Sequence, residues 1–121
     1  MRSTLNKTQD YKSLVSQYGS PLLILDTSII KEQYNLFKQC LPGVEVCFAI
    51  KCLNHPEMLK TLRDLGGSFD VATNGEIDLL TECEVSPSRC IHTHPIKKDH
   101  EIKRALEFGI TSFVVDNECE I

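Results

Sequence analysis

Apolar and polar positions along the chain follow two alternating periods. Short runs rich in β-branched and aromatic residues, typical of buried strands, lie at residues 45–50, 68–71, 90–93 and 112–115. These runs begin 22 or 23 residues apart. Between them, apolar residues recur at helical spacing, as Met58, Leu62 and Leu65 do in the first interval. The pattern predicts four strands separated by helices.

This regular alternation predicts parallel strands joined by right-handed crossovers in an α/β fold. A doubly wound sheet and a (β/α)8 TIM barrel both fit it. The units are even in length and no Gly-x-Gly-x-x-Gly motif follows any strand, which favours the barrel. A complete barrel takes about 250 residues, so we expect only about the first four β/α units here. Residues 116–121 resemble the first turn of a helix after the fourth strand.

Upstream of these units the pattern predicts a short helix near residues 10–17, a strand at 22–26 and a long helix at 27–40. The long helix carries an apolar stripe at spacings of three and four residues. The strand at 22–26 implies a second domain. We therefore assign residues 1–26 to a polar leader, a short helix and a strand of a β domain, and residues 27–121 to the incomplete barrel.

Composition narrows the function classes. The formal net charge of -4 and the absence of a basic cluster beyond Lys97 and Lys98 argue against a nucleic-acid partner. No apolar stretch approaches the roughly 20 residues that span a bilayer, and the amino terminus lacks a secretory signal pattern. The six cysteines are scattered without a Cys-x-x-Cys pair, which favours the reducing cytoplasm.

Lys51 is placed where the first predicted strand ends. Strand alternation puts Cys47, Ala49 and Lys51 on one face. Asn54 is the expected cap of the next helix, with Pro56 in its first turn. Because α/β folds carry their chemistry where strands lead into helices, Lys51 is the first catalytic candidate. The alternative is a solvated lysine that ends a strand.

Two acidic residues further along the chain, Asp70 and Glu76, are also candidates for the site. Asp70 lies 19 residues after Lys51, close to one β/α unit, so both side chains should reach the same rim of the sheet. An ordinary carboxylate at a turn is the alternative for Asp70. Glu76 ends the pattern Thr73-Asn74-Gly75-Glu76, a capping box that explains this residue without catalysis. Capping and a role at the site both stay open for Glu76.

Cys90, His92 and His94 alternate along the third predicted strand, which raises the possibility of a zinc site. Three ligands along one straight strand are too far apart to converge on one ion. We therefore expect no metal, and instead expect one of the histidines to line a pocket.

Several motifs together resemble one family. They lie in register at residues 18–22, 48–54, 67–72, 75–77, 87–91, 94–98 and 114–116. In this order they resemble the amino-terminal half of the fold-type III pyridoxal-phosphate decarboxylases, the ornithine and diaminopimelate decarboxylase group. The resemblance covers roughly residues 18–120 and implies a barrel of the alanine-racemase-like type. Alanine racemases themselves differ from this chain directly after the lysine.

The resemblance assigns roles to residues of this chain. It implies that Lys51 binds pyridoxal 5'-phosphate covalently, and that Asp70 and Glu76 lie at or near the cofactor. We add Ala49, which is small and shares a predicted strand face with Lys51, and His94, as the histidine expected to line the pocket. Lys51 and Asp70 would be the catalytic residues. The implied reaction is decarboxylation of a basic amino acid, ornithine-like, to a polyamine precursor by a cytoplasmic homodimer.

Residues that the family carries in its second half, among them its phosphate site, have no counterpart here, so we expect the 121 residues alone to be inactive. Two alternatives stay open. One is a non-catalytic relative that binds a partner without turnover, and the other is a single-domain cofactor-binding protein of the same barrel type.

Overall fold

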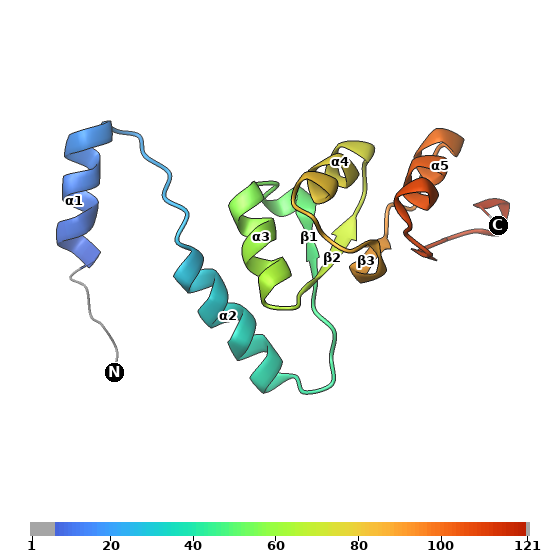
Figure 1. Cartoon of the computed structure of the whole chain (residues 1–121), viewed down its shortest axis with the longest axis horizontal. Coiled ribbons are helices and arrows are strands. Elements are labelled where there is room, and N and C mark those ends of the chain that lie inside the picture. Colours follow the sequence, from blue (N-terminus) through green and yellow to red (C-terminus); the bar gives the residue numbers. More distant parts are fainter. Residues whose placement is uncertain (1–6, 121) are drawn as a thin grey trace.

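The structure is a computed structural model that describes residues 7–120. Figure 1 shows its elements, which in chain order are α1 (Lys7–Tyr18), α2 (Thr27–Cys40), β1 (Cys47–Ala49), η1 (Ile50–Cys52), α3 (Pro56–Asp64), β2 (Ser68–Val71), α4 (Asn74–Glu82), η2 (Pro87–Arg89), β3 (Cys90–His92), α5 (Asp99–Phe108), β4 (Ser112–Phe113) and η3 (Glu118–Glu120). The η segments are single 3-10 turns.

The four strands form one sheet in the order β1-β2-β3-β4, and every neighbouring pair is parallel. Helices α3, α4 and α5 supply the three connections between these strands. This is the predicted arrangement of successive β/α units. Strands β1, β3 and β4 are shorter than predicted, and β2 has the predicted bounds.

Strand register divides the side chains of the sheet into two faces. Ala49, Asp70, Ile91 and Ser112 lie opposite one another across the four strands and share one face. Phe69 and Val71 belong to the other face, where they are fully buried. That face meets the helices in one core, whose buried helical members are Tyr34, Leu59, Leu62, Ile77, Leu80 and Ala105. The face with Asp70 is therefore the one that the helices leave open.

The beginning of α3 differs from the prediction by one residue. His55, not Asn54, is the cap: its Nδ1 accepts a hydrogen bond from the Glu57 N–H at 3.2 Å. Pro56 is the first helical residue, and a residue before proline is disfavoured in helical geometry. His55 accordingly has extended backbone angles, φ -95 and ψ 131, which is the usual conformation of a cap.

Residues 22–26, which the sequence predicts as a strand of a second domain, have no strand assigned in this structure. Leu23, between α1 and α2, is 92% exposed. A strand needs a neighbour for its backbone hydrogen bonds, and no described strand pairs with this segment. Helix α1 confirms the predicted short helix, and Figure 1 shows it apart from the sheet. Residues 1–6, which belong to the predicted polar leader, lie outside the described residues.

Three further predictions concern the rest of the chain. Helix α2 has the predicted bounds and packs against α3. The expected helical turn after the fourth strand is present as η3, with residue 121 outside the described range. All six cysteines are free. Within residues 7–120, no helix has the length and apolar character that crossing a bilayer requires.

Candidate active site

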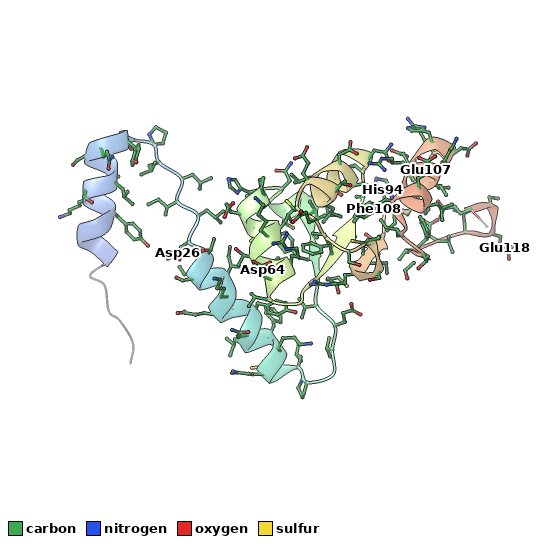
Figure 2. All side chains as sticks on the ribbon, viewed as in Figure 1. Asp26, Asp64, His94, Glu107, Phe108 and Glu118 are labelled. Carbon is green, nitrogen blue, oxygen red and sulfur yellow. The ribbon has the colours of Figure 1, made fainter. Side chains whose placement is uncertain are left out.

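The candidate residues lie around the carboxyl ends of β1, β2 and β3. Lys51 follows β1, Asp70 is the penultimate residue of β2, and Thr93 and His94 follow β3. Parallel strands end on the same edge of a sheet, so these positions share one rim. Figure 2 draws the side chains and shows His94 in the half of the molecule that carries α5.

Lys51 lies in η1 rather than on the strand face that alternation predicted. The chain leaves the strand geometry after Ala49, and the Leu53 N–H donates to the Ile50 carbonyl at 3.1 Å, which closes the turn. Ile50 is fully buried and anchors this turn, whereas Lys51 is exposed. Lys51 therefore lies just beyond the end of β1, as the sequence predicts, but it does not share a strand face with Cys47.

Asp70 lies opposite Ala49 in the strand register. Its Oδ1 accepts a hydrogen bond from the Thr93 hydroxyl, which reaches across from the end of β3. The pKa of the Cys47 thiol is raised by burial and further by the negative charges of Glu45 and Asp70. The half-buried Asp70 carboxylate therefore lies on the open face of the sheet, beside the small side chain of Ala49.

Glu76 makes the predicted capping box. Its Oε2 accepts from the backbone N–H groups of Ala72 and Thr73 at 2.6 and 3.2 Å, and its own N–H donates to the Thr73 hydroxyl at 3.3 Å. These contacts explain why a carboxylate is only 9% exposed at this point. They show the structural role of Glu76, while contact with a cofactor stays a prediction.

Cys90 and His92 belong to the face of the sheet that the helices cover. Cys90 is buried, and burial raises the pKa of its thiol to about 11. His92 is 1% exposed and stacks on Phe113, with ring centroids 5.7 Å apart. His92 thus does not line a pocket on the open face. Among the described residues, no group of three or more His, Cys, Asp or Glu side chains is placed to hold a metal ion.

His94 lies in the loop after β3 and is half-buried. Its Nδ1 accepts from the Ile96 N–H at 3.1 Å, so Nε2 is the ring nitrogen that this hydrogen bond leaves unused. The pKa of Glu101 in α5 is lowered by its hydrogen bond from the Lys98 backbone N–H and further by the charges of His100, Lys98 and His94.

Lys97 holds the same loop and was not identified as a site residue from the sequence. Its Nζ donates to the carbonyls of His94 at 3.0 Å and Val114 at 2.8 Å, and it pairs with Glu120 at 3.1 Å. The Lys97 side chain is 3% exposed. It ties the loop after β3 to the chain that follows β4. The sequence feature that could have identified Lys97 is its position as a basic residue shortly after the third predicted strand.

Both ring nitrogens of His92 are buried without a hydrogen-bond partner among the described residues. Burial lowers the pKa of His92 below its ordinary value of 6.5, and the charges of Lys97 and His94 lower it further, while Glu101 and Asp70 act weakly in the opposite direction. The folded protein therefore binds a proton at His92 less readily than the unfolded chain does.

We predict that the free energy of unfolding falls as the pH decreases below 6.5. At pH values between the folded and unfolded pKa of His92, the unfolded chain carries a proton on this residue and the folded protein does not. In this range the free energy of unfolding falls by about 1.4 kcal/mol for each pH unit. Above pH 6.5 His92 is neutral in both states, so it no longer makes the free energy of unfolding depend on pH. Denaturant unfolding of the wild type and the His92→Phe variant at several pH values measures the difference. The exposed His100→Gln variant is the control and should keep the wild-type pH dependence.

Comparison with known proteins gives a consistent result. The family described as "Pyridoxal-dependent decarboxylase, pyridoxal binding domain" matches residues 27–121. A lysine/ornithine decarboxylase of Selenomonas ruminantium is 32% identical over 113 residues, which are 93% of this chain and 29% of that protein. Antizyme inhibitor 2 of Xenopus laevis is 33% identical over 98 residues, 81% of this chain and 22% of that protein.

Among solved structures, the lysine/ornithine decarboxylase of Vibrio vulnificus complexed with putrescine superposes with a TM-score of 0.92 at 43% identity. The match covers 97% of this chain and 32% of that one. The same enzyme complexed with cadaverine gives a TM-score of 0.91. This chain thus spans about a third or less of the length of these relatives.

Proposed function

Because this chain belongs to the pyridoxal-dependent decarboxylase family, we propose that the whole protein removes the α-carboxyl group of a basic amino acid. The observation that carries this proposal is the common rim of Lys51 and Asp70 at the carboxyl ends of β1 and β2. Such a rim is where barrels of this type place their reacting groups.

The residues at the rim fit pyridoxal 5'-phosphate by their chemistry. An exposed lysine offers the primary amine that binds an aldehyde covalently. Ala49 is small enough to leave space for a flat ring beside Asp70. When bound, the ring accepts the electron pair that the departing carboxyl group leaves behind. We assign Lys51, Ala49 and Asp70 to this site, together with Glu76 at the start of α4 and the Nε2 side of His94.

Lys51 and Asp70 have separate tasks in this proposal. The Nζ of Lys51 would hold the cofactor covalently just beyond the end of β1. The Asp70 carboxylate attracts and orients the cationic amine of the incoming amino acid, because opposite charges at a partly buried site interact more strongly than in bulk water. Thr93 and the strand pairing of β2 hold that carboxylate at the rim.

The substrate proposed is ornithine or a close diamino acid rather than diaminopimelate. The stretch at residues 94–98 supports it, as does the similarity to enzymes named lysine/ornithine decarboxylase. We predict that carbon dioxide release is fastest with ornithine or lysine and at least about 10-fold slower with diaminopimelate. Diaminopimelate carries a second carboxyl group, and a substrate group that the pocket does not match costs about 1.4 kcal/mol or more. Assays of the whole protein with ornithine, lysine, arginine and diaminopimelate decide this, and a clear preference for diaminopimelate would refute the substrate assignment.

A second candidate is a non-catalytic relative that binds a partner without turnover. The similarity to antizyme inhibitor 2, a protein whose name is that of an inhibitor, supports it. The same assays separate the two candidates, since this second function requires that no amino acid releases carbon dioxide.

Three further assignments complete the proposal. Residues 1–26 would belong to a second domain, which would supply the strand neighbour that residues 22–26 lack among the described elements. The whole protein would act as a homodimer in the cytoplasm, where six free cysteines stay reduced. The 121 residues alone would be inactive.

A further inference from the structure

Among the described residues, Asp70 accepts a side-chain hydrogen bond from the hydroxyl of Thr93, the residue directly after β3. Asp70 pairs with Ile91 in the register of β2 and β3, and Thr93 lies two residues beyond Ile91 on the same face. The hydroxyl is thus on the open side of the sheet, one step nearer the rim than the carboxylate. A carboxylate has two oxygens, so a bond to Oδ1 still allows Oδ2 to face a second group.

The backbone of Thr93 is fixed on both sides. Its N–H donates to the Val71 carbonyl at 3.1 Å, which extends the pairing with β2 by one residue beyond β3. The Val114 N–H donates to the His92 carbonyl at 2.9 Å on the other side. Directly after Thr93, the Lys97 ammonium binds the His94 carbonyl at 3.0 Å. The Thr93 hydroxyl therefore projects from a rigid position.

We propose that Thr93 is a positioning residue that sets the orientation of the Asp70 carboxylate toward the amine groups at the rim. This inference rests on the function proposed for Asp70 and adds a residue to that site. The hydroxyl donates its proton to Oδ1, which selects one rotamer of Asp70 and directs Oδ2 away from β3. Active-site groups depend on such support, since small displacements of a reacting group cost up to about 100-fold in rate.

Other threonines of the chain show that this contact differs from an ordinary helical one. Thr61 and Thr81 donate their hydroxyls to the backbone carbonyls of Glu57 and Ile77, four residues earlier in their own helices, at 2.6 and 2.8 Å. The Thr93 hydroxyl instead binds a carboxylate on another strand. Thr81 is exposed on α4 and provides a matched control.

The test compares Thr93→Val, which keeps the shape and removes the hydroxyl, with Thr93→Ser, which keeps the hydroxyl, and with Thr81→Val. We expect Thr93→Val to lower kcat for the best diamino acid about 10-fold with little change in thermal unfolding, and Thr93→Ser to restore kcat to within about 3-fold of the wild type. Thr81→Val should match the wild type. In the Asp70→Asn background, Thr93→Val should have no additional effect, because the group it positions is absent.

A second readout is independent of catalysis. Crystal structures of the cofactor-free wild type and Thr93→Val protein should differ in the side-chain rotamer of Asp70. An unchanged Asp70 rotamer in Thr93→Val, or equal losses of kcat from Thr93→Val in the wild-type and Asp70→Asn backgrounds, would overturn the inference. If the wild type releases no carbon dioxide from any amino acid, the proposed function fails, whereas the crystallographic comparison still decides whether Thr93 orients Asp70.

Discussion

Replacing Lys51 with alanine is expected to lower carbon dioxide release from ornithine at least about 1,000-fold. The variant loses the amine that retains the cofactor at the rim, and no other described lysine lies within two residues of the carboxyl end of a strand. Lys51 is exposed, and its ammonium makes no ion pair among the described residues. The loss should therefore be in activity and not in the free energy of unfolding.

Two further variants sharpen this prediction. Lys51→Arg keeps the positive charge but not the primary amine, so it should be as inactive as Lys51→Ala. Lys60→Ala, on the surface of α3 and paired with Glu57 at 3.8 Å, should keep wild-type activity. Substantial activity in Lys51→Arg would show that charge alone suffices and would contradict covalent binding at this position.

The Asp70→Asn variant is expected to lose about 100-fold in kcat/KM for ornithine. Asparagine has the shape of aspartate, and its amide oxygen can still accept from the Thr93 hydroxyl. The substitution thus removes the negative charge while it retains the hydrogen bond. Steady-state kinetics with ornithine measure the loss, which should appear in kcat as well as in KM.

Asp78→Asn is the matched control for this variant. Asp78, in the middle of α4, pairs with Arg104 of α5 at 2.6 Å, and its side chain is 61% exposed. An exposed ion pair of this kind contributes little to stability, so Asp78→Asn should leave kcat/KM unchanged. Equal activity of Asp70→Asn and the wild type would mean that Asp70 is only a structural partner of Thr93.

The elements of this fold that depend on local pattern could be predicted from the sequence. The bounds of α2 and β2 follow from an apolar stripe at helical spacing and from a short apolar run between two turns. The capping box of Glu76 is also a local pattern and was confirmed. Family membership rests on several such motifs in register and was confirmed over residues 27–121.

Features that depend on contacts between distant residues could not be predicted. The turn at Lys51 is closed by a bond between Leu53 and Ile50, which apolar periodicity does not encode. The hydroxyl of Thr93 meets Asp70 only because β2 and β3 pair in one particular register. Alternation showed that Cys90 and His92 share a face, but which face the helices cover emerged only from the packed sheet.

The position of the covalent bond tests the central claim most directly. The whole protein, loaded with pyridoxal 5'-phosphate, is reduced with borohydride, digested with trypsin and mapped by mass spectrometry. Trypsin does not cleave after a modified lysine, so a cofactor on Lys51 should appear in one uncut peptide, residues 39–60, between the cleavage sites at Lys38 and Lys60. This modified peptide is the predicted result, and a cofactor adduct on another lysine, or no adduct at all, would contradict the account.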